Sequence, residues 1–275
     1  MPNVVTVHPL LALVRNEVQF VLPLGLDLPG WEELARKIIS DFGPSPTGDV
    51  SALLSMPFGL RHWAVIDVQL RGKATLGFRF LILSKTEWMS GVDPFLLSQA
   101  YPPDWDSRGH TDSFQHELVF TPPTVEQVAI WLKEHDRATL LGGLQAVLDG
   151  AKLWHESTNT STAYVRTLWN LLPYRSRFDF NFSTFSFQPM AELKYQVLPK
   201  EALPALLPVG VLSLQQTGDY PLGRYEQALQ LAITDGDAGE FEMLLRRRTS
   251  RDTLRLAVGL LIAMMVGLVV VSLMK

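Results

Sequence analysis

The stretch HWAVIDVQLRGKATLGFRFLILS, from His62 to Ser84, carries the strongest fold signal in the chain. Residues 62–70 and 74–84 are rich in β-branched and aromatic side chains, and Arg-Gly-Lys at 71–73 forms a compact turn between them, so a β-hairpin is predicted. Both arms are nearly continuous apolar runs, which is typical of central strands covered on both faces. The hairpin therefore predicts a sheet that is packed between other elements.

Helical and strand patterns surround this hairpin on both sides. GWEELARKIISDF, residues 30–42, has apolar residues at helical spacing and acids in its first turn. Further helices are expected at residues 93–100, 124–134, 138–149, 161–172 and 224–245, the last interrupted near Gly236. Short strands are expected at residues 18–24, 115–120 and 152–155. The predicted fold class is α/β or α+β, a mixed sheet with flanking helices.

An aromatic stretch, RFDFNFSTFSF, follows the helix expected at residues 161–172. Phe178, Phe180 and Phe182 share one parity and alternate with polar residues, which predicts a half-buried strand over 178–187. Residues 193–198 are its expected partner. Stacking of nucleic-acid bases on these rings is the alternative to core packing.

The C-terminal segment LAVGLLIAMMVGLVVVSLM, residues 256–274, is uncharged and has Ser272 as its only polar side chain. As a helix its nineteen residues would span about 28 Å, close to the ~30 Å hydrocarbon core of a bilayer. One C-terminal transmembrane helix is therefore predicted. A buried core helix is the alternative, but core helices of this length nearly always carry some polar residues.

The flanks of this segment predict its orientation. Lys275 alone follows it, whereas an arginine cluster precedes it, made of Arg246, Arg247, Arg248, Arg251 and Arg255. The positive-inside rule then predicts a cytoplasmic location for the large domain, and no signal peptide is recognisable at the N-terminus. The arginines are expected to attract anionic lipid headgroups.

The predicted organisation has three parts. A globular cytoplasmic domain covers residues 1–222, with two lobes, 1–150 and 151–222, as a possibility. A helical juxtamembrane segment with the arginine cluster covers residues 223–255, and the transmembrane helix covers residues 256–274. Gly259, Ala263 and Gly267 form a smooth face on this helix, at a spacing that favours close approach of a second helix.

Charge and cysteine content exclude several classes of function. Of the 24 basic residues 18 lie in residues 1–245, and of the 28 acidic residues 27 do, so this part carries about −9. Nucleic acid is therefore not an expected partner, since phosphate binding needs a basic face. The chain has no cysteine, which excludes disulfides and thiol catalysis.

Motifs for catalysis are mostly missing. The chain has no phosphate-binding loop, no HExxH and no GxSxG. The closest approach to a cluster of catalytic or metal-binding residues is in GHTDSFQHE, where His110, Asp112, His116 and Glu117 could bind zinc or act as acid and base. A polar loop leading into a strand explains the same residues, and would turn His116 and Glu117 to opposite faces. No cofactor is predicted.

Large aromatic residues stand near prolines in the irregular stretches. Trp88, Phe95, Trp105 and Trp169, together with Phe182, are expected to pin these loops onto the core. The sharper hypothesis is that the same loops form a groove for a partner.

Two of these stretches resemble a known family. WMSGVDPFLLSQAYPPDW, residues 88–105, and LWNLLPYRSRFDFNFSTFSF, residues 168–187, are similar to the N-terminal region of bacterial GTPase-associated protein one. The resemblance covers about residues 60–200 and implies an adaptor in an NTPase-dependent signalling or conflict system. It supplies no catalytic residue.

Taken together, these features predict a membrane-tethered cytoplasmic adaptor that binds a protein partner, and the resemblance implies a GTPase as that partner. The first alternative is a membrane-proximal enzyme that uses residues 110–117. The second is a structural subunit of a membrane assembly, held through the smooth face of the transmembrane helix.

Overall fold

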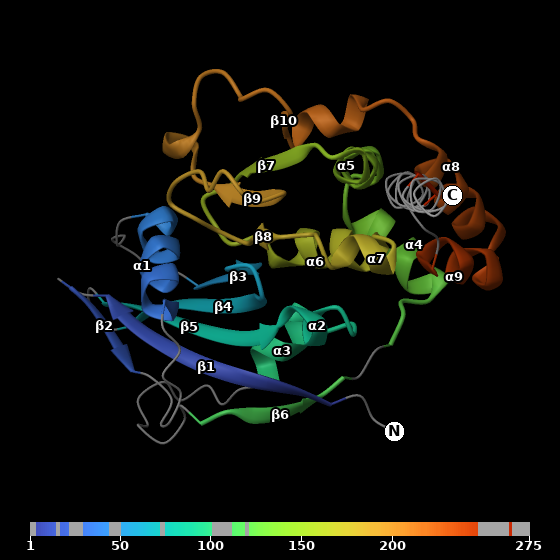
Figure 1. Cartoon of the computed structure of the whole chain (residues 1–275). Coiled ribbons are helices and arrows are strands. Elements are labelled where there is room, and N and C mark those ends of the chain that lie inside the picture. The colour runs from blue at the N-terminus through green and yellow to red at the C-terminus, as the bar shows by residue number, and fades with distance from the viewer. Residues whose placement is uncertain are drawn as a thin grey trace, which may run out of the picture.

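The computed structural model describes residues 4–14, 17–21, 30–43, 51–71, 75–100, 112–118, 121–246 and 264–265. Within these residues the centre of the molecule is a ten-stranded mixed sheet with helices around it (Figure 1). Nine strands follow the order β10-β7-β9-β8-β3-β4-β5-β1-β2, and β6 pairs with β1 outside this path. The predicted class, a mixed α/β sheet with flanking helices, is confirmed at this level.

The strands are β1 (Val4–Val14), β2 (Val18–Val21), β3 (Ser51–Phe58), β4 (His62–Arg71), β5 (Thr75–Ser84), β6 (Phe114–Glu117), β7 (Lys152–Glu156), β8 (Phe182–Ser183), β9 (Tyr195–Leu198) and β10 (Val211–Ser213). The helices are α1 (Trp31–Phe42), α2 (Lys85–Trp88), α3 (Pro94–Ala100), α4 (Val125–Glu134), α5 (Arg137–Asp149), α6 (Thr162–Leu171), α7 (Tyr174–Arg177), α8 (Arg224–Asp235) and α9 (Ala238–Arg246), with 3-10 turns η1 (Lys200–Ala202) and η2 (Gln215–Asp219).

The hairpin predicted from residues 62–84 is β4 and β5, and it lies inside the sheet between β3 and β1. Its two faces meet different helices. Phe78 of β5 packs edge-on against Phe42 of α1, whereas Arg79, on the opposite face, donates to the carbonyl of Ser98 in α3. Because both faces are covered, the apolar runs of the hairpin are continuous instead of alternating.

Polar residues on the α3 side of the hairpin are paired. Arg79 Nη2 lies 2.8 Å from Asp67 Oδ2, and the two residues are direct cross-strand neighbours. Burial raises the pKa of the Asp67 carboxyl, and the charge and hydrogen bond of Arg79 oppose this shift. The pair therefore offsets the cost of two polar side chains in an otherwise apolar layer.

The expected half-buried strand at 178–187 is wrong. Only Phe182 and Ser183 are strand, and they lie between β3 and β9 with their neighbours buried on both sides. Two of the polar residues that suggested a solvent face, Asn181 and Ser183, are buried and bond to backbone groups. Asn181 donates to Glu192 O and accepts from Lys194 N, both at 2.9 Å. Ser183 Oγ bonds to the backbone of Phe185, which ends the strand in a tight turn.

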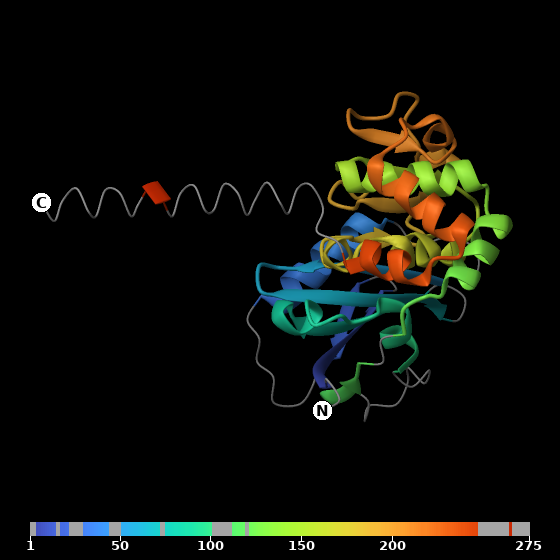
Figure 2. The same cartoon turned by 90° about the vertical axis from the view of Figure 1, so that its right-hand side faces the viewer.

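Strands from both halves of the chain share this sheet, because β8 pairs antiparallel with β3 while β7, β9 and β10 add parallel strands beyond it. The sheet thus continues across residue 150, where two lobes were considered. The segment expected as a juxtamembrane helix is helical to Arg246, and it packs on the body: Leu229, Phe241 and Leu245 are buried in the core. Figure 2 shows α8 against the green helices α4 and α5, and α9 packs beside α8 and α7.

Within the described part of the chain, none of the helices has both the length and the apolar character needed to cross a bilayer. The predicted transmembrane segment, 256–274, lies outside the described residues except for Met264 and Met265, which are helical and exposed. The arginines beyond Arg246 and the smooth face of Gly259, Ala263 and Gly267 also lie outside them.

Candidate functional site

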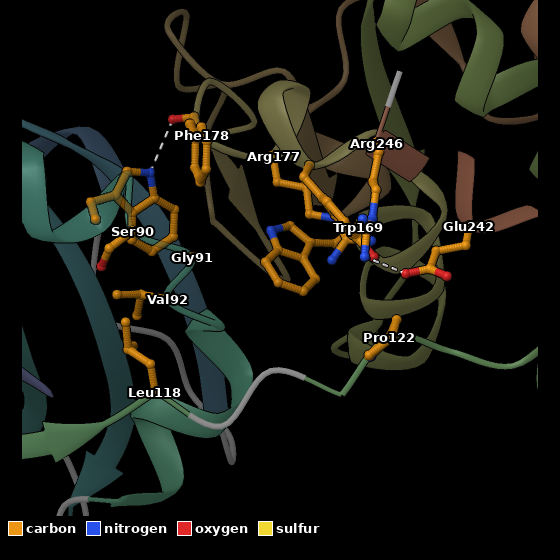
Figure 3. A pocket seen from close by; sticks show the side chains of 12 residues that line it. Ser90, Gly91, Val92, Leu118, Pro122, Trp169, Arg177, Phe178, Glu242 and Arg246 are labelled. Carbon is orange, nitrogen blue, oxygen red and sulfur yellow. Dashed lines mark hydrogen bonds and ion pairs between the residues drawn. The ribbon is translucent and has the colours of Figure 1, made fainter. Parts of the chain in front are cut away.

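A cavity of about 500 Å³ opens where the hairpin side of the molecule meets the C-terminal helices (Figure 3). We call it the Trp88 cavity. One wall comes from α2, the turn after it and the end of β6, and the other comes from α6, α7 and α9. Its lining residues are Trp88, Ser90, Gly91, Val92, Leu118, Pro122, Trp169, Tyr174, Arg177, Phe178, Glu242 and Arg246.

Trp88 is held in place by the helix that carries it. Ser84 and Glu87 form a capping box at the start of α2, and Glu87 Oε1 also accepts a hydrogen bond from Thr6 N of β1 at 2.9 Å. These hydrogen bonds lower the pKa of Glu87, against the opposing effect of burial. The indole of Trp88 stacks on Trp63 of β4 at 4.7 Å and donates from Nε1 to Phe178 O at 3.0 Å. That last bond ties the two walls together.

Trp169 forms the back of the cavity and is 3% exposed. Phe95 packs edge-on against it at 6.2 Å and stacks on Phe182 at 5.3 Å. The indole Nε1 of Trp169 is buried and has no hydrogen-bond partner among the described residues. Unsatisfied buried donors of this kind are uncommon in folded proteins.

Arg177 is the charged residue nearest to this wall, and it is 3% exposed. Its Nε donates to Leu172 O at 2.9 Å and its Nη2 to Asn170 O at 2.6 Å, so it caps the C-terminal carbonyls left open by α6. The guanidinium lies over the rings of Trp169 and Tyr174. Burial lowers the pKa of Arg177 to about 10, so it is a cation at neutral pH.

The rim of the cavity belongs to α9. Glu242 and Arg246 are one helical turn apart and form an exposed ion pair. Figure 3 shows both side chains on the same side of the cavity as Arg177 and Trp169. The lining of the cavity thus contains two arginines, Arg177 and Arg246, and one acid, Glu242. The site can therefore bind apolar surface that carries an anionic group.

A second hollow of about 800 Å³ runs beside α6 and shares Trp169 with the Trp88 cavity. We call it the α6 cleft. One face of α6 lines it with Thr162, Arg166, Thr167 and Asn170. The remaining lining residues are Asp93, Leu96, Thr121, Pro123, Gln127, Trp131, Glu134, His135 and Ala163. Unlike the cavity, this cleft offers many hydrogen-bond donors and acceptors.

Asp93 connects the cleft with α3. Its Oδ1 accepts from Phe95 N at 2.7 Å and from Leu96 N at 3.2 Å, at the start of the helix. Burial raises the pKa of the Asp93 carboxyl, while these backbone bonds and the positive charges of Arg166 and Arg177 act in the opposite direction.

The polar group proposed at 110–117 is placed only in part, because His110 lies outside the described residues. Asp112 is exposed, and β6 turns His116 and Glu117 to opposite sides, as the period of a strand requires. Burial lowers the pKa of His116, and Asp93 is the opposing charge. In the described part of the chain no three histidine or acidic side chains come together as a metal site would need.

Three residues of the predicted partner groove are now located, and Trp105 lies outside the described part. Trp88 and Trp169 line the same cavity. Phe95 packs behind Trp169 and faces a smaller hollow of about 280 Å³ near Arg166. The sequence interpretation missed Tyr174, Arg177, Phe178 and Glu242. A usable signal was present: residues 162–177 contain three arginines and no acid, in a strongly acidic domain.

No known family model matches this chain, and no curated protein is found as a relative.

Proposed function

We propose that the protein is a membrane-tethered adaptor, anchored by residues 256–274, whose α/β body binds a protein partner in the α6 cleft. The observation that carries this proposal is the position of Arg246. It ends α9 on the rim of the Trp88 cavity, and the sequence continues from it into four more arginines and the uncharged segment. The arginine excess on this side supports a cytoplasmic body.

The cleft supports the adaptor part of the proposal. A bound peptide segment must satisfy its own backbone N–H and C=O groups, and Gln127, Thr167 and Asn170 supply side chains for this purpose. Arg166 and Glu134 add charges of both signs at the surface. Such a mixed lining favours a polar protein segment over a purely apolar ligand.

The identity of the partner is proposed from resemblance. The two stretches that resemble GTPase-associated protein one, residues 88–105 and 168–187, contribute Trp88, Asp93, Trp169 and Asn170 to the two hollows. We therefore propose a GTPase or related NTPase as the partner.

The anchor is tested by charge. Leu261→Arg combined with Leu268→Arg places two cations near the centre of the segment, at a cost of about 3 kcal/mol each for insertion. The double variant is expected to leave the membrane pellet after alkaline extraction, while the matched Leu261→Ala, Leu268→Ala variant stays. An unchanged distribution of the arginine variant would refute the anchor.

The partner site is tested by position-specific cross-linking in cells. A photoreactive residue at Gln127, exposed in the cleft, is expected to capture a nucleotide-hydrolysing protein, while one at Glu201 in η1 captures none. Arg166→Ala in the Gln127 background is expected to lower the yield. Equal capture from both positions would contradict the cleft as the partner site.

A further inference from the structure

The Trp88 cavity differs from the cleft in chemistry, although the two share Trp169. Its walls are mostly apolar, from Trp88, Val92, Leu118 and Phe178. Charge is confined to one side, at Arg177 and the Glu242–Arg246 pair. A volume of about 500 Å³ falls in the range of sites that enclose a small ligand.

We propose that this cavity binds an acyl chain of an anionic phospholipid from the bilayer that holds the anchor, with the lipid headgroup beside Arg177 and Arg246. The proposal rests on the membrane tether proposed above. It adds a specific lipid site to the general attraction between an arginine cluster and an anionic surface.

The first argument is that an acyl chain brings no polar groups that need hydrogen-bond partners in the cavity. A protein segment in this cavity would bring backbone donors and acceptors that the apolar walls cannot satisfy, and each unsatisfied group would cost free energy. An acyl chain brings none. The apolar contact area is then available without a penalty, and only the headgroup needs partners at the charged side.

The second argument is charge. Arg177 is a buried cation stacked on Trp169, and Arg246 adds a second guanidinium at the exposed rim. With Glu242 as the acid on this rim, the lining carries a net positive charge, in a body that is otherwise acidic. A phosphate group matches the geometry of a guanidinium, whereas a zwitterionic headgroup brings its own cation.

The third argument is reach. Nine residues lie between Arg246 and Leu256, where the uncharged segment begins. Even fully extended, such a linker spans at most about 35 Å. The cavity rim is thus held near the headgroups of any bilayer that the segment enters, at a high local concentration of lipid.

The experiment uses the full chain in phosphatidylcholine nanodiscs that contain an increasing fraction of phosphatidylglycerol brominated on one acyl chain. Bromine quenches tryptophan only at near contact, and the chain has seven tryptophans. Subtracting the signal of Trp169→Phe isolates Trp169. This substitution removes no hydrogen bond between described residues, because Nε1 has no partner there. Trp169 belongs to the body and lines both hollows, so its quenching reports a chain in contact with the body, and the Ser90→Phe variant of the cavity lining separates the Trp88 cavity from the α6 cleft.

We expect brominated phosphatidylglycerol to quench Trp169, and brominated phosphatidylcholine to quench it much less. Ser90→Phe, which adds a ring to an exposed residue of the lining, should abolish the quenching. Because it also removes the exposed bond from Ser90 Oγ to Glu87 O, Ser90→Ala, which removes the same bond without adding a ring, should keep the quenching. Arg246→Ala should raise the half-quenching fraction about fivefold, as expected for one interfacial arginine. Arg224→Ala, an equal charge change at the start of α8 and outside the cavity lining, should not.

Several outcomes would overturn the proposal. Quenching that persists in Ser90→Phe would place the lipid elsewhere, and equal quenching by both lipids would remove the role of charge. Absence of Trp169 quenching in loaded nanodiscs would exclude a chain in the cavity while leaving the anchor intact. If the protein instead fails to enter the nanodiscs, the anchor is refuted. Quenching of that soluble protein by dispersed brominated fatty acid would then identify a free amphiphile, and not a membrane lipid, as the ligand.

Discussion

The guanidinium of Arg177 lies 4.5 Å from the ring centroid of Trp169 while it donates to the carbonyls of Leu172 and Asn170. One buried side chain thus closes the end of α6, packs against the indole that lines both cavity and cleft, and places a positive charge on the wall of the Trp88 cavity. The shape and the charge of the candidate site depend on this one relationship.

Removing this cation should destabilise the fold. Arg177→Met leaves two buried carbonyls without their donor, and we expect the free energy of unfolding to fall by about 3 kcal/mol. Urea unfolding of the full chain in detergent measures it. The neighbouring Arg175 is exposed, so Arg175→Met should change stability by no more than about 0.5 kcal/mol. Similar losses for both variants would contradict the structural role of Arg177.

The contact between α5 and η2 depends on the absence of a side chain at Gly142. A Cβ there would come within 1.9 Å of Thr217 O, a backbone atom that cannot move alone. Gly142→Ala should therefore destabilise the protein by about 2 kcal/mol or more. Gly218→Ala, on the other side of the same contact, meets only ordinary distances and should be nearly neutral. Thermal unfolding of the two variants provides the comparison.

His155 should make stability depend on pH. Burial lowers its pKa below 6.5, and its Nδ1 lies 2.9 Å from Tyr195 Oη. As pH falls below 6.5 the unfolded chain takes up a proton that the folded protein resists, so stability decreases in this range. His155→Phe removes the titrating group and should lose less stability over the same interval. A titration of the histidine ring by NMR checks the direction of the pKa shift, and a pKa above 6.5 would refute the argument.

Association through the predicted membrane helix has its own test. In the predicted helix the spacing of Gly259, Ala263 and Gly267 would bring them to one face, and bulky residues there should block close approach of a second helix. Gly259→Ile with Gly267→Ile is expected to abolish the signal of a membrane self-association reporter. Val258→Ile with Val266→Ile, on a neighbouring face, serves as the control. If the glycine variants keep the full signal, the predicted role in a membrane assembly is wrong.

Prediction from sequence succeeded where structure is local. The hairpin at 62–84, α1, α3, α4, and the break between α8 and α9 all follow from periodicity and turn residues over a few positions. The strand β1 is not among the strands predicted from the sequence, because the apolar residues before position 18 show no clear period. In the sheet Pro9 lies between the residues that pair with β6 and those that pair with β2.

In the aromatic stretch at 178–187, the alternation of polar and apolar residues does not correspond to a strand with one solvent-exposed face. Its alternation is real, but Asn181 and Ser183 bury their polar atoms against backbone groups of residues 185–194. A pattern of polar and apolar residues cannot distinguish solvent from a buried hydrogen-bond partner. For the same reason, no local pattern identified Arg177 as a buried residue of the site. The carbonyls that accept its hydrogen bonds lie five and seven residues earlier, beyond the turn at Pro173.

The sequence by itself determined the mixed sheet with flanking helices, the acidic body, and the uncharged C-terminal segment with its arginines, because each depends on composition or on neighbours within a few residues. Only the tertiary structure decided that Trp88, Trp169, Arg177 and Arg246 line one cavity. These residues are brought together by the packing of α2, α6, α7 and α9 around the sheet, and no local pattern encodes a contact between positions that lie so far apart in the chain.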